Sequence, residues 1–165
     1  MISLVYESCG EIIQSNCDII CIYLNRDSII NGKMFKRIKE KYPEVIEKFK
    51  DMRKETIHKK RVGNHYMISA NDGTIFVFIN INTNINTLYS KKQKELISKV
   101  YYRIINKATK RGIPLTIGMQ KLLPHVFKES KNFVIIASLI EDVFASAYVE
   151  VFLIRPDGRL WSFSF

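Results

Sequence analysis

An almost wholly apolar run, residues 19–24, leads into a polar loop that reaches Gly32 and Lys33 and then into a basic segment with helical spacing. A short run that is apolar at every position predicts a strand covered on both faces of a sheet. In α/β proteins, the loop after such a strand lies at the sheet edge where ligands bind. We therefore expect the loop of residues 25–33 to belong to a ligand site.

Three stretches predict helices. Apolar residues recur at three- and four-residue intervals across residues 34–52, but Pro43 lies inside this stretch, so we expect two helices with Pro43 in the first turn of the second. Ser90 and Gln93 have the spacing of a capping box in front of an amphipathic pattern at residues 96–108. Residues 133–144 are apolar nearly all round, which predicts a buried helix.

The remaining apolar segments predict strands between these helices. Residues 71–73 read Asn-Asp-Gly, a strong turn signal that joins two of the strands in a hairpin. The predicted strands are residues 3–6, 18–24, 63–68, 74–81, 113–118, 148–154 and a half-buried 160–165. Strands that alternate with helices imply a largely parallel sheet with helices on both faces. We predict an α/β fold, a three-layer α/β/α sandwich with a mixed, mainly parallel sheet and an extra C-terminal hairpin strand.

Charge is concentrated on two of the predicted helices. The chain of 165 residues has a formal net charge of +10, with 47% hydrophobic and 25% charged residues, as expected for a globular protein. Residues 33–61 contain 12 lysines and arginines against 5 acidic residues, and residues 91–111 contain 8 against 1. This pattern favours either a basic face for a phosphate-bearing partner or two ordinary solvated helix faces.

Cysteine and histidine usage points away from a metal or disulfide framework. The three cysteines, Cys9, Cys17 and Cys21, are odd in number, and no Cys or His pair completes a tetrahedral set with them. We expect no metal site and no cofactor. No apolar run approaches the roughly 18 residues of a membrane span, and no signal-peptide pattern follows the N-terminus, so we expect a cytoplasmic protein in a single domain of residues 1–165.

Six short stretches have a characteristic order and spacing along the chain. They are residues 10–12, 18–21, 36–43, 113–118, 138–144 and 149–152. In these stretches the chain resembles macrodomains over about residues 4–154, with residues 155–165 as an extension. It is most similar to the terminal ADP-ribose glycohydrolase type and its phage and bacterial relatives. The resemblance implies a macrodomain sandwich that binds ADP-ribose or a related nucleotide.

The same resemblance suggests ligand-binding residues, each with a structural alternative. Glu11 stands where the family has an aspartate that reads the adenine amino group, but it also fits an exposed loop carboxylate. Asn25 matches a ribose contact or a turn-forming asparagine at a strand end. Gly32 and Gly118 match remnants of phosphate-binding loops or ordinary turn glycines. Phe152 matches an aromatic that stacks on a base or a core residue.

The departures from the family pattern lie in the ligand loops. Ile22 replaces the first asparagine of the first loop, and few of the usual glycines remain. Glycines matter there because backbone N–H groups can close on a diphosphate only where the chain takes positive φ and no Cβ intrudes. The acidic residue that this subgroup uses for catalysis has no evident counterpart, and Lys33 or Lys36 stands nearest to the family's catalytic lysine. We therefore expect weak or no hydrolysis.

Two other functions stay open. A degenerate macrodomain scaffold that has lost its nucleotide would bind a protein or nucleic-acid partner through the basic helices of residues 33–61 and 91–111, or through an aromatic patch of Trp161, Phe163 and Phe165. Those aromatics equally fit a strand that extends the sheet. A true ADP-ribosyl hydrolase is the third possibility. A composition rich in Ile, Lys and Asn suggests an AT-rich genome, which fits a phage or viral protein that acts in the host cytoplasm.

Overall fold

The structure is a computed structural model that describes residues 4–9, 11–24, 30, 32–55, 61–81, 88–110, 115–120, 131–145, 147 and 149–155. Within these ranges the strands and helices follow the predicted order. In chain order they are β1 (Leu4–Cys9), the short 3-10 helix η1 (Ile12–Gln14), β2 (Ile19–Leu24), α1 (Gly32–Lys41), α2 (Pro43–Glu55), β3 (His65–Ser69), β4 (Ile75–Asn80), α3 (Lys91–Thr109), β5 (Leu115–Gln120), α4 (Lys131–Phe144) and β6 (Val149–Arg155).

The strands form one mixed sheet in the order β1-β6-β5-β2-β4-β3. All neighbouring pairs are parallel except β3 and β4, which form the predicted antiparallel hairpin at one side of the sheet. Gly73 takes a φ of +91° in the hairpin turn, a conformation that glycine adopts without strain. The mainly parallel sheet predicted from the sequence is therefore confirmed.

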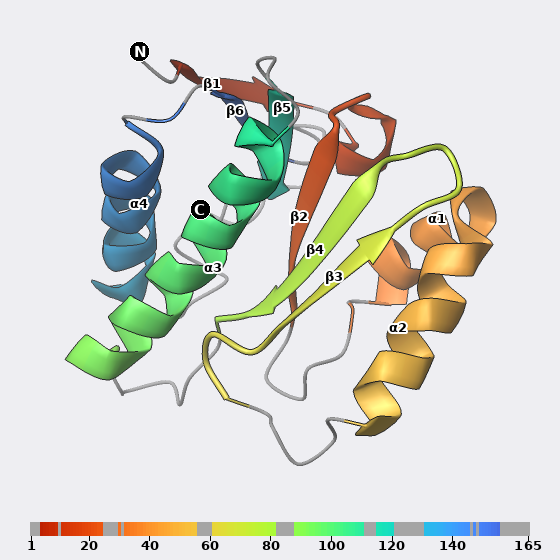
Figure 1. The fold of residues 1–165 in the computed structure, drawn as a ribbon, viewed down its shortest axis with the longest axis horizontal. Coiled ribbons are helices and arrows are strands. Elements are labelled where there is room, and N and C mark those ends of the chain that lie inside the picture. Colours follow the sequence, from red (N-terminus) through yellow and green to blue (C-terminus); the bar gives the residue numbers. More distant parts are fainter. Residues whose placement is uncertain are drawn as a thin grey trace, which may run out of the picture.

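Helices cover both faces of the sheet, so the fold has three layers (Figure 1). Ile20, Ile22 and Leu24 of β2 pack in one core cluster with residues of α1 and α2. Ile19, Cys21 and Tyr23 point the other way and pack in a second cluster with residues of α3 and α4. Successive residues of a strand face opposite sides of the sheet, which explains why all six residues of β2 are buried.

The predicted helix starts agree with the structure. α1 ends at Lys41 and α2 begins at Pro43, where the missing proline N–H costs no helical hydrogen bond. At the start of α3, the Ser90 N–H donates to Gln93 Oε1 (2.8 Å) and the Gln93 N–H donates to Ser90 Oγ (3.1 Å). This reciprocal pair is the capping box that the sequence predicted.

Two expectations differ from the structure. β5 continues to Gln120, so Gly118 lies inside the strand and not at the start of a loop. α4 is not buried all round, because only one side packs on the sheet and α3, and Val134 on the other side is 60% exposed.

None of the described helices is long and apolar enough to cross a membrane. The C-terminal strand of residues 160–165 lies outside the described residues, and the single domain of residues 1–165 stays a prediction.

Candidate functional site

The two central strands of the sheet, β2 and β5, are parallel neighbours. Their ladder pairs residues 19–21 of β2 with residues 117–119 of β5, and β2 pairs with β4 along its whole length. Beyond this short ladder, the Tyr23 N–H donates to the side-chain oxygen of Gln120 at 2.7 Å. The chain leaves β2 toward one side of the sheet and β5 toward the other, which is the switch point where α/β sheets open a crevice for a ligand.

Glu11 follows the carboxyl end of β1 and is held by α1. Its Oε1 atom lies 2.9 Å from Arg37 Nη2, and the two side chains are 34% and 38% exposed, respectively. One helical turn further along α1, Lys41 donates from Nζ to the carbonyl oxygen of Ile13 at 3.2 Å. These two contacts tie η1 to α1. Arg37 was not among the predicted site residues, although the four-residue spacing of Lys33, Arg37 and Lys41 places them in one row of the helix.

The two candidate glycines lie in different surroundings. Gly32 is the first residue of α1, and a Cβ built there would meet nothing within 4 Å. Gly118 lies under the segment that joins η1 to β2, where a Cβ would lie 3.2 Å from Cys17 Sγ and 3.2 Å from Ile154 Cδ1. The expected position of Gly118 in a loop is wrong, and its role as a ligand residue stays a prediction.

The other candidate residues are spread along the same face and edge. Phe152 pairs with Gly118 across the β5–β6 ladder and is half-buried against the core cluster of α1 and α2. Lys33 and Lys36 are exposed on the first turns of α1. Asn25 and the aromatics Trp161, Phe163 and Phe165 lie outside the described residues.

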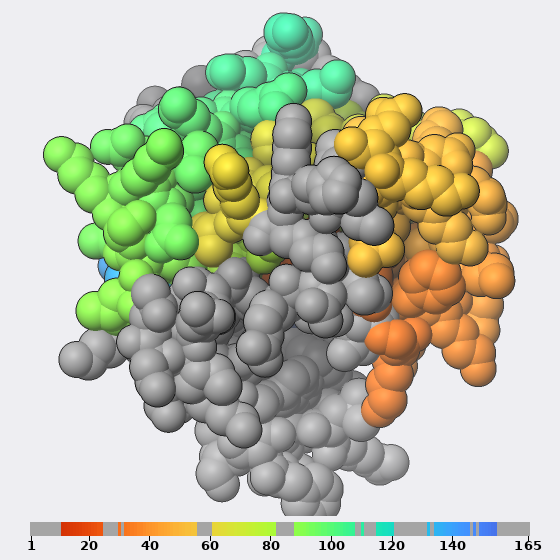
Figure 2. Space-filling view, turned by 90° about the horizontal axis from the view of Figure 1, so that it is seen from below, coloured from red at the N-terminus to blue at the C-terminus, as the bar shows by residue number. Residues whose placement is uncertain are grey.

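Two helices direct positive charge to the edge where β2 and β4 end. α1 follows β2 and α3 follows β4, so both helices begin at this edge, and the amino end of a helix carries a partial positive charge. Lys33 and Lys36 of α1 and Lys91 and Lys92 of α3 add full charges there. Figure 2 shows the molecule from below, with α3 in green on one side and α1 in orange on the other. This arrangement favours an anionic ligand at the edge.

Solved structures resemble this fold although the sequences differ. No protein-family model matches the sequence, and no curated protein matches it. The structure is similar to the macrodomain of Mycobacterium tuberculosis DarG, with a TM-score of 0.62, 10% identity, and 94% of this chain and 99% of that chain covered. It is also similar to a mutant of the Oceanobacillus iheyensis macrodomain, with a TM-score of 0.64, 13% identity, and 94% and 82% covered. The chain has the macrodomain fold.

A third structural neighbour was solved with a ligand. Thermosipho africanus DarTG in complex with ADP-ribose matches this macrodomain fold with a TM-score of 0.55 and 17% identity, over 90% of this chain and 41% of that chain. Identities this low show a shared fold, and they leave the ligand of the present chain to be argued from its own residues.

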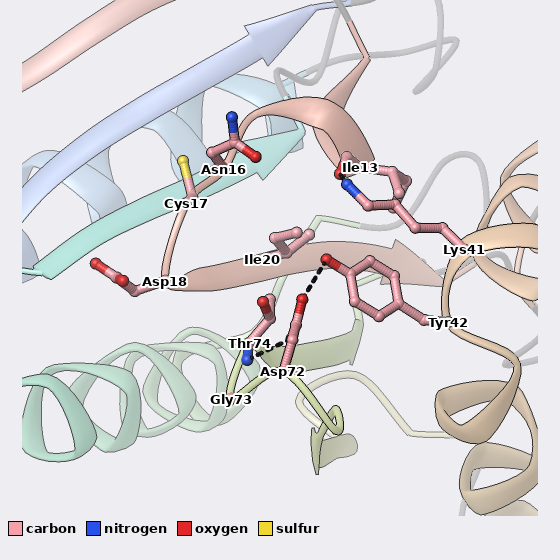
Figure 3. A pocket seen from close by; sticks show the side chains of 10 residues that line it. All are labelled: Ile13, Asn16, Cys17, Asp18, Ile20, Lys41, Tyr42, Asp72, Gly73 and Thr74. Atoms are coloured by element: carbon pink, nitrogen blue, oxygen red, sulfur yellow. Dashed lines mark hydrogen bonds between the residues drawn. The ribbon is translucent and has the colours of Figure 1, made fainter.

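A separate cavity of about 260 Å³ lies at the amino end of β2 (Figure 3). Its polar groups largely bind one another: Tyr42 Oη donates to Asp72 Oδ2 at 3.1 Å, and the Thr74 N–H donates to Asp72 Oδ1 at 2.9 Å. Hydrogen bonds from Thr74 hold the pKa of Asp72 below its ordinary value. Burial raises the pKa of the Cys17 thiol, which also lines the cavity and is therefore not activated as a nucleophile.

Proposed function

We propose that this macrodomain binds ADP-ribose or a related nucleotide at the switch point between β2 and β5, with weak or no hydrolysis. The observation that carries the proposal is the strand order, which places the switch point of the sheet between β2 and β5, beside the cationic amino end of α1. The neighbour solved with ADP-ribose supports the ligand class.

The diphosphate would lie against the amino end of α1. Gly32 adds no Cβ there, so a phosphate can approach the backbone of the first turn closely, and Lys33 and Lys36 supply charge. Glu11, one oxygen of which binds Arg37, keeps its second oxygen for a base amino group. Phe152, half-buried in the β6 strand that pairs with β1, would stack on the base.

We expect weak or absent hydrolysis because the candidate catalytic residues are incomplete. The acidic residue that the resembling subgroup uses for catalysis has no evident counterpart in this sequence. Lys33 and Lys36 are exposed, whereas a nucleophilic or proton-transferring lysine is activated by a desolvated surrounding. If the protein were instead a hydrolase, it would release ADP-ribose from a modified protein in a gel assay, and a Lys33→Ala, Lys36→Ala double variant would lose this release.

Calorimetric titration with ADP-ribose tests the binding function. We expect saturable micromolar binding, and a loss of about 10- to 100-fold in affinity for Glu11→Ala, because hydrogen bonds to a charged group contribute about 1.5–3 kcal/mol. Glu40→Ala, which removes an exposed carboxylate of α1 with the same change in charge, is the matched control. No detectable heat up to millimolar ligand would refute nucleotide binding. Equal affinities for the two variants would refute the role of Glu11 alone.

The alternative is a scaffold that binds a macromolecule without a nucleotide. The excess of lysines on α1 and α3 supports it, as would a partner that still binds when Glu11 and Asn25 are changed. Substituting Trp161, Phe163 and Phe165 together tests the aromatic patch, since a partner docked there would be lost while ADP-ribose affinity stays the same.

A further inference from the structure

We propose that the outward face of α3 binds single-stranded nucleic acid, independently of the ADP-ribose site. The face consists of the exposed residues on the side of α3 turned away from the sheet. These are Lys91, Lys92, Glu95, Lys99, Tyr102, Arg103, Asn106, Lys107 and, just after the helix, Lys110. The proposal rests on the charge of this face, on its length and on one exposed aromatic side chain.

The cations of α3 are not neutralised by neighbouring carboxylates in the described part of the chain. α3 contains six lysines and arginines and one acidic residue, Glu95. The ion pairs of Arg37 with Glu11 and of Lys50 with Glu47 lie elsewhere in the described part of the chain. α2 shows the contrast, because its four cations stand beside four acidic residues and Lys50 lies 4.0 Å from Glu47. A concentrated charge of one sign attracts a polyanion.

The face is long and is fixed in place. Ile97, Val100 and Ile104 are buried against the sheet, so the opposite side of the helix points to solvent along its length. Lys92 and Lys107 are separated by about 22 Å at 1.5 Å per residue, which matches several nucleotides of an extended strand. Arg103 lies at the border of this face, where His65 of β3 holds it with Nη1 and Nε2 2.7 Å apart.

Tyr102 indicates why the polyanion is single-stranded. Its side chain is 53% exposed, and it lies among cations, three residues after Lys99 and next to Arg103. An aromatic ring on a cationic surface stacks on unpaired bases, which a duplex keeps inside its own stack. An acidic protein or an anionic membrane could also bind the lysines, but neither has bases on which the ring of Tyr102 could stack.

Fluorescence anisotropy with labelled 20-mers of thymidine and of uridine nucleotides tests the proposal, and the two probes separate DNA from RNA as the source of the strand. If five cations contact phosphates, the affinity falls about 100-fold between 50 and 200 mM salt. Lys99→Gln with Lys107→Gln, away from the amino end of α3, is expected to flatten the logarithmic salt slope by about 1.4. Lys50→Gln with Lys54→Gln on α2 removes the same charge and is expected to leave the slope unchanged.

Tyr102→Ala is expected to weaken binding about 5- to 150-fold, and Tyr102→Trp to keep it, because base–aromatic stacking contributes about 1–3 kcal/mol per base. Saturating ADP-ribose is expected to leave the affinity for the strand unchanged. This measurement in the presence of ADP-ribose distinguishes the two proposals, since the α3 face can bind a strand whether or not the protein binds ADP-ribose.

Four results would overturn the proposal. They are no binding at 50 mM salt, equal losses from the α2 and α3 charge variants, displacement of the strand by ADP-ribose, and tighter binding to a 20-base-pair duplex or to anionic phosphatidylserine vesicles than to the single strand. Because the substituted residues are exposed, we expect each variant to fold. Circular dichroism of each variant checks this.

Discussion

Replacing Gly118 with alanine tests whether this glycine is needed for packing or for a ligand. The new Cβ would lie 3.2 Å from Cys17 Sγ and from Ile154 Cδ1, and 3.4 Å from Ser15 Oγ, whereas carbon contacts are most favourable at about 3.5–4.0 Å. The backbone adds no strain of its own, because the glycines with positive φ in the described residues are Gly63 and Gly73. The cost of the substitution is therefore steric.

Overpacking of this kind costs about 1–3 kcal/mol. Alanine also restricts the unfolded chain, which offsets about 0.4–1 kcal/mol of that cost. We expect Gly118→Ala to lower the free energy of unfolding by about 0.5–2 kcal/mol and the Tm by about 2–4 °C for each kcal/mol. Urea denaturation followed by circular dichroism measures the first quantity, and calorimetry measures the second.

Two further variants sharpen the test. Gly32→Ala is the matched control, because a Cβ there meets open space and alanine favours a helix, so its stability should equal or exceed that of the wild type. Cys17→Ala removes one of the clashing atoms. Combined with Gly118→Ala it should cost less than the sum of the two single changes, by at least about 0.5 kcal/mol.

The packing explanation is wrong if Gly118→Ala unfolds at the same urea concentration as the wild type, or if the Cys17 and Gly118 changes are additive. The ADP-ribose affinity of the folded Gly118→Ala variant answers the second question. An unchanged affinity assigns the glycine to packing alone, and a loss in the folded variant supports its predicted place among the ligand-binding residues.

Three other predictions follow from local contacts. Ser90→Ala removes the acceptor of the Gln93 N–H at the start of α3 and should cost about 0.5–2 kcal/mol in urea denaturation; an unchanged midpoint would contradict the capping box. Tyr23 and Tyr101 share a buried hydrogen bond of 3.1 Å between their hydroxyls, so exchanging both for phenylalanine should cost less in calorimetry than the two single changes added, and strict additivity would argue against the bond. Burial and Arg103 hold the pKa of His65 below its ordinary value, so the folded state resists protonation and stability should fall as the pH drops from about 7 toward 5; a His65→Gln variant with the same pH slope would rule this out.

The order of strands and helices could be predicted from the sequence because it depends on short-range patterns. The division of residues 34–52 at Pro43, the Asn-Asp-Gly turn and the capping box of Ser90 and Gln93 each involve residues a few positions apart. Such contacts form inside one element, so the side-chain types that favour them can be recognised in a linear sequence. The parallel sheet followed from the alternation of strands and helices.

The tertiary structure decided what surrounds the candidate site. The pairing of Glu11 with Arg37, the closeness of Gly118 to Cys17, and the pairing of β2 with β5 at the switch point all depend on residues far apart in the chain. The prediction that α4 is buried all round was also wrong, since one side of the helix is exposed. An apolar composition does not show which faces of a helix pack against another element. Local sequence patterns determine which strands and helices form. Only the packing of these elements determines which side chains come into contact, and a ligand site consists of such contacts.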